Sequence, residues 1–155
     1  MSRRKRKKTS INCNDYESHI VKKLVNYVMQ DGKKSISKYI VEDSISNLKK
    51  KIQIDSKIII KRIIKNIKPS IEVKSKKIGG VTYKIPVEIG ESRATSISLK
   101  WIVETARNRQ DSKTMVKKLY LELLDVYLRK GKSLKKKEEM HRIAESNRAF
   151  SNCKW

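Results

Sequence analysis

The chain has few residues of the kinds that build metal sites or disulfide frameworks. Its two cysteines, Cys13 and Cys153, stand near opposite ends and form no CxxC spacing. They support neither a zinc site nor a disulfide framework. The two histidines, His19 and His141, lie far apart in the sequence, and we interpret both as surface or interface residues. The sequence thus predicts no bound metal and no cofactor.

Catalytic motifs are also missing. The chain contains no glycine-rich phosphate loop, no HExxH and no GxSxG motif. Glu138 and Glu139 form an acidic pair, but adjacent positions of a helix point about 100° apart. Lys136 and Arg142 offer these glutamates ordinary ion pairs at helical spacing. We therefore predict that the protein has no catalytic residues and is not an enzyme, an enzyme acting on RNA included.

Long hydrophobic runs are absent as well. Hydrophobic residues make up 37% of the chain, which is enough for one modest core. The densest run, IIIKRIIKNI from Ile58, is interrupted by lysine and arginine, so no segment is long enough to span a membrane. The basic start leads into polar residues, which fits neither a secretory signal nor a transit peptide. We expect a protein that either works in the compartment where it is made or is imported by a route that the sequence does not show, with no membrane partner.

Acidic residues are scarce relative to basic ones. The chain has 16 Asp and Glu against 39 Lys and Arg, and its net charge is +23. Such a chain repels itself unless a polyanion neutralises it, so we predict a nucleic-acid partner. Residues 2–10 (SRRKRKKTS) are mostly basic, and we predict that residues 1–14 form a basic arm that is disordered until it binds. Residues 15–155 are then a single helical domain.

Helical periodicity covers most of this domain. Apolar residues recur at three- and four-residue intervals in six segments, which predict helices at about 15–30, 34–52, 56–67, 92–108, 112–129 and from 133 onward. The third segment is rich in β-branched isoleucine, but the spacing of Ile60, Ile63 and Ile64 favours a helix. Ser92 is the expected N-cap of the fourth helix. Trp101 lies in an apolar stripe, so we predict that it packs in the core and does not stack on a base.

One segment alternates as a pair of strands does. Extended runs flank Gly79 and Gly80 and predict a β-hairpin over residues 70–89. A three-residue loop, residues 78–80, brings the apolar side chains onto one face: Ile71, Val73, Ile85 and Val87. The opposite face then carries Glu72, Lys74, Lys76, Thr82, Lys84 and Pro86. Because a lone two-stranded ribbon is marginal in water, we expect it to lean on other parts of the structure, with its basic face toward a polyanion.

Five pieces of the sequence, in order, carry a resemblance to a known family. They are MSRRKRKK at the start, DGKKS at 31–35, IKPSIEVKSKKIGGVTYKIPVEI at 67–89, KWIVETARNR at 100–109 and KKEEMHRIAESNRAF at 136–150. In these pieces the chain resembles small-subunit ribosomal protein seven of bacteria and organelles, along essentially its whole length. The resemblance implies a mainly α fold: a six-helix bundle with a two-stranded β-hairpin arm protruding between the third and fourth helices.

The resemblance also implies a function. Proteins like this one are structural constituents of the small ribosomal subunit that bind the 3′ major domain of its rRNA directly and nucleate assembly of the head. They lie near the tRNA exit site, close to tRNA and mRNA, and beside the head and platform proteins numbered nine and eleven. A basic architectural DNA-binding protein is the alternative reading of the same helices and ribbon. A membrane-surface protein is disfavoured, because the apolar helix faces are needed for the core.

The resemblance and the charge pattern together select candidate RNA-contacting residues. These lie in the N-terminal arm, after the first helix, in the ribbon, at the start of the fifth helix and in the last helix. The candidates are Arg3, Arg4, Lys5, Arg6, Lys8, Lys33, Lys34, Lys74, Lys76, Lys77, Lys84, Met115, Lys136, Lys137, Arg142 and Arg148.

The chain departs from the family pattern in two respects. Residues 9–15 lack the prolines that the family often carries there, so the resemblance does not define the path of the arm. Lysine replaces arginine at many positions, for example Lys100, and lysine cannot form arginine's bidentate contact with phosphate. The abundance of lysine, isoleucine and asparagine suggests an AT-rich genome. With the missing transit peptide, this favours an organelle-encoded protein of plastid ribosomes (chloroplasts) over one of a bacterial cytoplasm.

Overall fold

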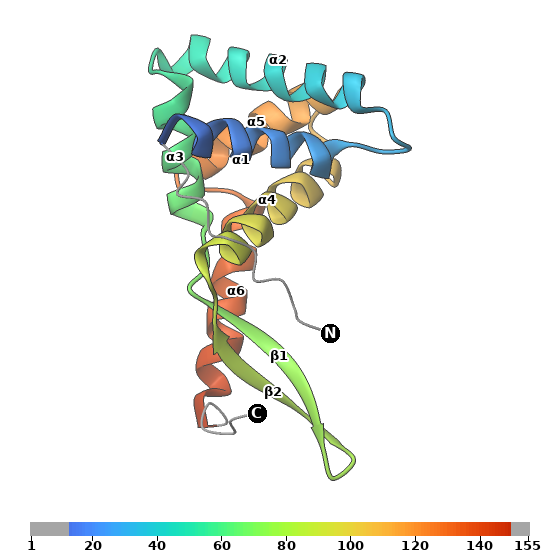
Figure 1. Cartoon of the computed structure of the whole chain (residues 1–155), viewed down its shortest axis with the longest axis vertical. Coiled ribbons are helices and arrows are strands. Elements are labelled where there is room, and N and C mark those ends of the chain that lie inside the picture. Colours follow the sequence, from blue (N-terminus) through green and yellow to red (C-terminus); the bar gives the residue numbers. More distant parts are fainter. Residues whose placement is uncertain (1–12, 150–155) are drawn as a thin grey trace, which may run out of the picture.

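The computed structural model describes residues 13–149, and side chains from residue 19 onward except that of Ile78. Within this range the chain is mainly α, with six helices and an antiparallel hairpin between the third and fourth, as predicted (Figure 1). The elements are α1 (Cys13–Val28), α2 (Lys34–Ile52), α3 (Ser56–Ile67), β1 (Ile71–Ile78), β2 (Val81–Glu88), α4 (Glu91–Arg107), α5 (Met115–Tyr127) and α6 (Lys132–Ser146). Most of the basic arm lies outside the described residues, so its disorder and the division of the chain at residue 14 stay predictions.

The elements form a body at one end and a stem at the other (Figure 1). α1, α2 and α5 lie in the body, α4 crosses beneath them, and α6 runs down beside the hairpin in the stem. The core lies among the first five helices and includes Ile20, Val41, Ile63, Ile102 and Leu119, none more than 2% exposed. Burying an aliphatic side chain of this size contributes roughly 1.5–3 kcal/mol. The core therefore stabilises the body, and the stem depends on its own contacts.

The isoleucine-rich α3 is a helix, as its spacing predicts. Ile59, Ile63, Ile64 and Ile67 are buried along one side of it. Helical spacing puts all four on the face that meets the body, and this burial outweighs the weak preference of isoleucine for strands. Trp101 is 9% exposed and belongs to the core, which confirms its predicted role.

The predicted cap of α4 is wrong by two residues. The helix begins at Glu91, and Gly90 is its N-cap, with extended φ of −66° and ψ of 149°. No side chain caps this end: the carbonyl of Gly90 accepts the first helical bond from the Ala94 amide at 3.0 Å. Glu91 places its charge in the first turn, where the helix dipole favours it. Ser92 therefore lies inside the helix, where its hydroxyl cannot serve as the cap.

The predicted register of the hairpin is also wrong. Ile78 pairs with Val81, so the loop is the two residues Gly79 and Gly80. Both have positive φ, 56° and 86°, which glycine adopts easily. A two-residue turn with positive φ at both positions matches the right-handed twist of the two strands that it joins. The one-residue difference from the predicted loop exchanges the faces of one whole strand relative to the other. The apolar side chains are therefore divided between the two faces.

The faces of the ribbon follow from this register. One face carries Glu72, Lys74, Lys76, Tyr83, Ile85 and Val87, and the other carries Ile71, Val73, Ser75, Lys77, Thr82, Lys84, Pro86 and Glu88. The second face lies against α6, because Ile71, Val73 and Pro86 line two hollows whose other walls are mostly α6 side chains. The ribbon thus leans on the last helix, as a two-stranded ribbon in water requires.

A glycine at the junction of body and stem provides a test of this arrangement. Gly131, the N-cap of α6, has φ of 103° and ψ of 167°, a region of the backbone map that is essentially reserved for glycine. A Cβ added there would lie 3.0 Å from the Cβ of Asp125. Gly131→Ala should therefore lower the free energy of unfolding by about 1–3 kcal/mol in urea titrations.

Gly90→Ala is the matched control for this substitution. Gly90 also precedes a helix, but its φ is negative and a Cβ there would meet no atom within 4 Å. The control should change the free energy of unfolding by less than about 1 kcal/mol. Equal losses for the two variants would contradict the steric argument for Gly131.

Candidate nucleic-acid interface

Apart from Met115 at the start of α5, the predicted RNA-contacting residues of the described chain fall into two separate groups. One group lies on the ribbon and α6 in the stem, and the other lies at the junction of α1 and α2 in the body. The stem and this junction belong to different ends of the molecule (Figure 1). Arg3, Arg4, Lys5, Arg6 and Lys8 lie outside the described residues, and their role stays a prediction.

The ribbon lysines do not share one face. Lys74 and Lys76 lie on one face, and Lys77 and Lys84 lie on the face toward α6. The predicted single basic face with Lys74, Lys76 and Lys84 is therefore wrong, for the same reason as the register. Lys74, Lys77 and Lys84 are exposed. The ribbon consequently presents cations on both sides and can contact a polyanion on either.

A buried glutamate holds the base of the ribbon. Glu72 is 6% exposed, and its carboxylate accepts hydrogen bonds from Arg93 Nε of α4 at 2.7 and 2.9 Å. Lys74 Nζ lies 3.6 Å from the same carboxylate. The sequence pattern placed Glu72 on an exposed basic face, so it missed this contact. The one indication in the sequence was that Glu72 is the single acidic residue among the lysines of its strand. A carboxylate that is buried needs a cation nearby.

The second face of the ribbon, α4 and α6 enclose a hollow of about 370 Å³. Lys84 and Lys136 line it from opposite sides, and Trp101 forms part of its wall. Lys136 Nζ is 3.0 Å from Glu104 Oε2, so the charge of Lys136 is partly neutralised within the protein. The predicted contacts Lys84 and Lys136 thus lie around one hollow although they are far apart in the sequence.

The other α6 candidates differ in exposure. Lys137 is half-buried, and its Nζ donates a hydrogen bond to the carbonyl of Asn66 at the end of α3, at 2.8 Å. Burial lowers the pKa of Lys137. Arg142 is exposed, and Arg148, just beyond α6, lines a hollow with His141 and Glu145. Arg142 and Arg148 are available to a partner, whereas Lys137 already joins α6 to α3.

At the α1–α2 junction both lysines are exposed. Lys33 and Lys34 follow a turn in which Asp31 and Gly32 both have positive φ. The loop between α1 and α2 projects beyond the ends of both helices (Figure 1). Met115 differs from these residues: it is half-buried and packs against the core at the start of α5. Its partial exposure leaves part of the side chain for contact with a partner.

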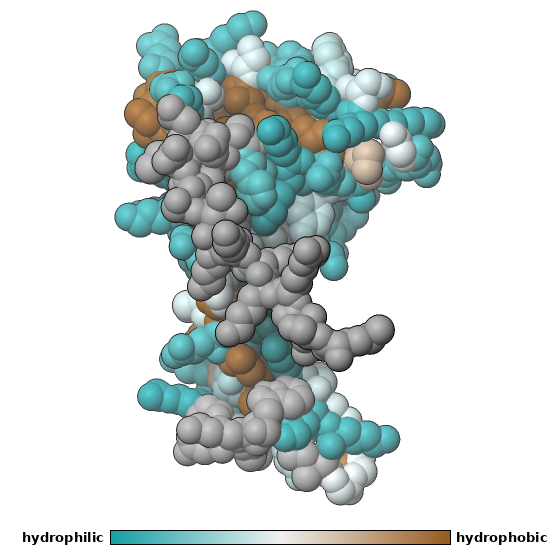
Figure 2. All heavy atoms as spheres, viewed as in Figure 1, coloured by the Kyte–Doolittle hydropathy of each residue, from teal (hydrophilic) through white to brown (hydrophobic). Residues whose placement is uncertain are grey.

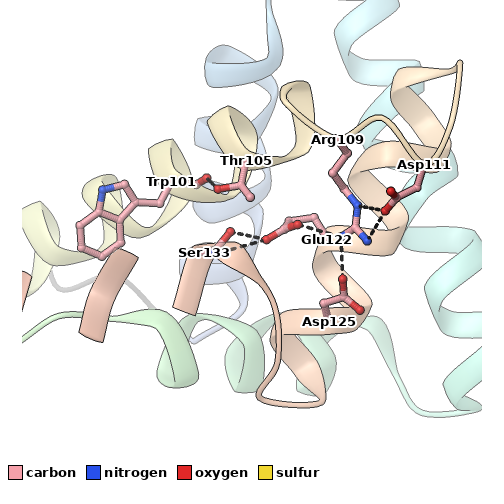
Figure 3. Close-up of polar contacts among 7 residues, drawn as sticks. All are labelled: Trp101, Thr105, Arg109, Asp111, Glu122, Asp125 and Ser133. Atoms are coloured by element: carbon pink, nitrogen blue, oxygen red, sulfur yellow. Dashed lines mark hydrogen bonds and ion pairs between the residues drawn. The ribbon is translucent and has the colours of Figure 1, made fainter. Parts of the chain in front are cut away.

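A buried polar network fixes where the stem leaves the body (Figure 3). Glu122 of α5 is 1% exposed, and Arg109 Nη1 donates to its Oε2 at 2.8 Å. The other carboxylate oxygen, Oε1, accepts hydrogen bonds from the amide and the hydroxyl of Ser133 in the first turn of α6. Arg109 also donates to Asp125 at 2.6 Å and to Asp111 at 3.0 Å. Glu122 thus caps the N-terminus of α6 from a different helix. The positive end of the helix dipole there also stabilises a carboxylate.

The charge of Arg109 is firmly held in this network. Burial by itself lowers the pKa of Arg109, but hydrogen bonds to Asp125, Asp111 and Glu122 outweigh burial and raise the pKa above its ordinary value. The guanidinium therefore stays protonated at every pH of interest. The network was missed from the sequence because Arg109, Glu122 and Ser133 lie in the α4–α5 loop, α5 and α6, and no local spacing joins these three.

The described residues hold neither a metal cluster nor a membrane-spanning helix. Nowhere in residues 13–149 do three His, Cys, Asp or Glu side chains gather so that they could hold a metal ion. The helices of the described range are also too short or too polar to cross a membrane. The candidate interface is therefore a set of exposed cations on a rigid helical frame.

These features define a class: a small, strongly basic helical protein with a projecting ribbon, with hydrophilic residues on both the body and the stem of the face shown in Figure 2. The chain belongs to the family of ribosomal protein S7p/S5e, whose model matches residues 1–148. The resemblance seen in the sequence is confirmed, and the chain is a ribosomal protein of the small subunit.

Similar proteins are bacterial and match over nearly their full length. The small ribosomal subunit protein uS7 of Pelagibacter ubique is 40% identical, over 100% of both chains. That of Thermodesulfovibrio yellowstonii is 44% identical over 90% of this chain and 89% of the relative, and that of Mycobacterium avium is 41% identical over 96% and 95%. The relatives are structural ribosomal proteins and not enzymes.

The buried network predicts a large loss of stability when its cation is removed. Arg109→Met leaves the carboxylate of Glu122 buried without its charged partner, and breaking a buried pair in this way costs about 3–5 kcal/mol. The free energy of unfolding, measured in urea, should fall by this amount. Glu104→Gln is the control, because it removes the exposed pair with Lys136 and should cost less than about 1 kcal/mol. A loss from Arg109→Met no larger than that of the control would contradict the proposed anchor.

Proposed function

We propose that the protein binds the 3′ major domain of small-subunit rRNA directly and nucleates assembly of the head near the tRNA exit site. The observation that carries this proposal is the combination of family membership with exposed cations at both ends of a rigid helical body. The candidate contacts in the described chain are Lys33, Lys34, Lys74, Lys76, Lys77, Lys84, Met115, Lys136, Lys137, Arg142 and Arg148. The basic arm adds Arg3, Arg4, Lys5, Arg6 and Lys8.

The mechanism is electrostatic and architectural. Each cation that meets a phosphate releases a condensed counterion, which drives binding without reading bases. Structured RNA is recognised mostly by its shape and backbone, so a rigid body with cations at fixed positions can hold several RNA helices in one arrangement. The arm orders on the RNA at the same time, at some cost in conformational entropy. Binding of this kind establishes the geometry on which later proteins assemble.

The remaining parts of the proposal concern its surroundings. The neighbours are head and platform proteins, numbers nine and eleven, and tRNA and mRNA pass close to the ribbon. The composition, rich in lysine, isoleucine and asparagine, supports a plastid ribosome, whereas the relatives described above come from bacteria. DNA is the alternative ligand, and competition between duplex DNA and the rRNA domain for the purified protein separates the two. Stronger binding to the DNA would overturn the proposal.

Affinity for the rRNA domain should fall steeply with salt. If about six phosphates are contacted, raising the salt from about 50 to 200 mM should weaken binding roughly a thousandfold. The measurement is a filter-binding titration at several salt concentrations, combined with a footprint on complete small-subunit rRNA. Protection is expected within the 3′ major domain. Salt-independent binding, or protection in another domain, would contradict the proposal.

The two faces of the ribbon should not contribute equally. Lys77 and Lys84 lie on the face beside α6, where Lys136 adds to the positive charge, whereas Lys74 already lies near Glu72. The double variant K77Q/K84Q should therefore lose more affinity for the rRNA than K74Q/K76Q, although both remove two charges. The titration above measures this difference, and equal losses would argue that the ribbon acts only through its total charge.

A further inference from the structure

An open apolar groove lies on the body, where Figure 2 shows hydrophobic residues gathered between α2 and α1. Its volume is about 700 Å³, and α1, α2 and α3 supply its walls. Its floor is aliphatic, with Val21 and Val25 of α1 and Ile60 of α3, and it is named here the three-helix groove. The three helices pack on one core, so the groove is formed before any partner arrives. Apart from Lys34, none of its described lining residues is among the rRNA contacts proposed above.

The rim of the three-helix groove is positively charged. Among the described residues that line it, one is acidic, Glu42, and four are lysines: Lys22, Lys34, Lys38 and Lys57. Glu42 Oε1 lies 3.7 Å from Lys38 Nζ, and both side chains are exposed. Positive charges thus outnumber negative ones around the aliphatic floor. A partner that fills the groove must therefore bring carboxylates beside an apolar surface of its own.

A small void lies beneath the floor of the groove. Val21 and Ile60 also border a cavity of about 20 Å³ inside the core, and every described side chain around this cavity is aliphatic. A buried water molecule needs at least two polar partners, and these side chains offer none. Side chains that border a void lose packing contacts on that side. An apolar side chain pressed onto Val21 and Ile60 from the groove would push them toward the void and recover part of that packing.

The charge and the floor of the groove together select its occupant. RNA phosphates can meet the lysines but cannot cover an aliphatic floor, and no aromatic side chain among the described lining residues offers a surface on which a base could stack. Residues 1–12 of the chain itself carry six Lys and Arg and no acid, so the basic rim repels them. A second copy of the chain, with a net charge of +23, is repelled in the same way. An acidic segment with an apolar stripe satisfies both the rim and the floor.

We propose that the three-helix groove docks an acidic amphipathic helix of a partner protein. Apolar side chains at positions i, i+3 or i+4 and i+7 of that helix lie on Val21, Val25 and Ile60, which is the usual way in which a helix fills a hydrophobic groove. Carboxylates on either side of its apolar stripe meet the rim lysines, Lys22 and Lys34 among them. This docking goes beyond rRNA binding and does not depend on it, because the groove is built by the packing of three helices alone.

The first experiment tests the chemistry of the occupant with synthetic peptides. The probe has about 18 residues, long enough to form a helix, with a leucine stripe at helical spacing and glutamate and alanine elsewhere. One control peptide has serine in place of every leucine, and the other has lysine in place of every glutamate. Fluorescence anisotropy with the full chain should show that each control binds at least about tenfold more weakly than the probe.

Each other outcome of the peptide titrations contradicts the proposal. Equal affinity of the serine peptide would mean that charge alone decides binding, as it does for a polyanion such as RNA. Equal affinity of the lysine peptide would mean that the basic rim does not select the partner. Failure of the probe itself to bind would overturn the proposal directly, whatever the affinity of the chain for rRNA.

The second experiment tests the place of binding with matched variants. K22E/K34E reverses two exposed charges of the rim, and K113E/K117E reverses two exposed charges outside the groove. Lys34 and Lys113 both lie near the N-terminus of a helix, and Lys22 and Lys117 both lie within one. The rim variant should bind the acidic probe at least about tenfold more weakly, and the control less than about threefold more weakly. Equal losses would overturn the proposal.

A fluorophore locates the bound probe independently of these charges. It is attached at Asn26→Cys, an exposed position that lines the groove, in a chain whose Cys13 and Cys153 are replaced by serine. The comparison is Gln110→Cys, an exposed position in the loop before α5. The acidic probe should shift the emission at position 26 and leave that at position 110 unchanged. A shift at position 110 as large as that at position 26 would overturn the proposal.

Discussion

The carboxylate of Glu122 determines how the two ends of the molecule are joined. Its two oxygens contact different elements: one accepts from Arg109 before α5, and the other accepts from Ser133 at the start of α6. Because α6 supports the ribbon, the direction of the ribbon depends on this buried contact and on the strained backbone of Gly131 beside it. The direction of α6 also places Arg142 and Arg148. A neutral core residue could pack at this position, but it could not cap α6.

The fold could be predicted from the sequence wherever the spacing of apolar residues along a single helix determines which face is buried. Helical spacing correctly identified six helices, including the isoleucine-rich α3, and the core position of Trp101. The predictions fail or miss contacts where the outcome depends on the pairing between two elements. The register of the hairpin depends on whether Ile78 belongs to the loop, and alternation alone does not decide this. The Arg109 network and the Glu72 contact join residues from separate elements, so no local pattern could reveal them.

The same limit applies to the candidate interface. Charge and resemblance selected residues by position, and the structure shows how different their surroundings are. Arg142 is exposed, Lys137 is engaged with Asn66, and Met115 packs on the core. Lys50 and Lys51 were not selected, because they form an ordinary basic helix end in the sequence, and they line one hollow with Lys117 only because α2 packs on α5. A net charge of +23 therefore predicts a polyanionic partner, and packing decides which cations can share it.

The dependence of the ribbon on α6 has a consequence for how the chain acquires its structure during synthesis. The hairpin is complete at Glu88, but the helix that supports it begins only at Lys132. A two-stranded ribbon is marginal in water by itself. While the chain is being made, the ribbon is therefore exposed with a lysine-rich surface and no supporting helix, and it gains its support only when the C-terminal segment leaves the ribosome that makes it. A helix translated well after the hairpin thus completes an arm that begins earlier in the chain.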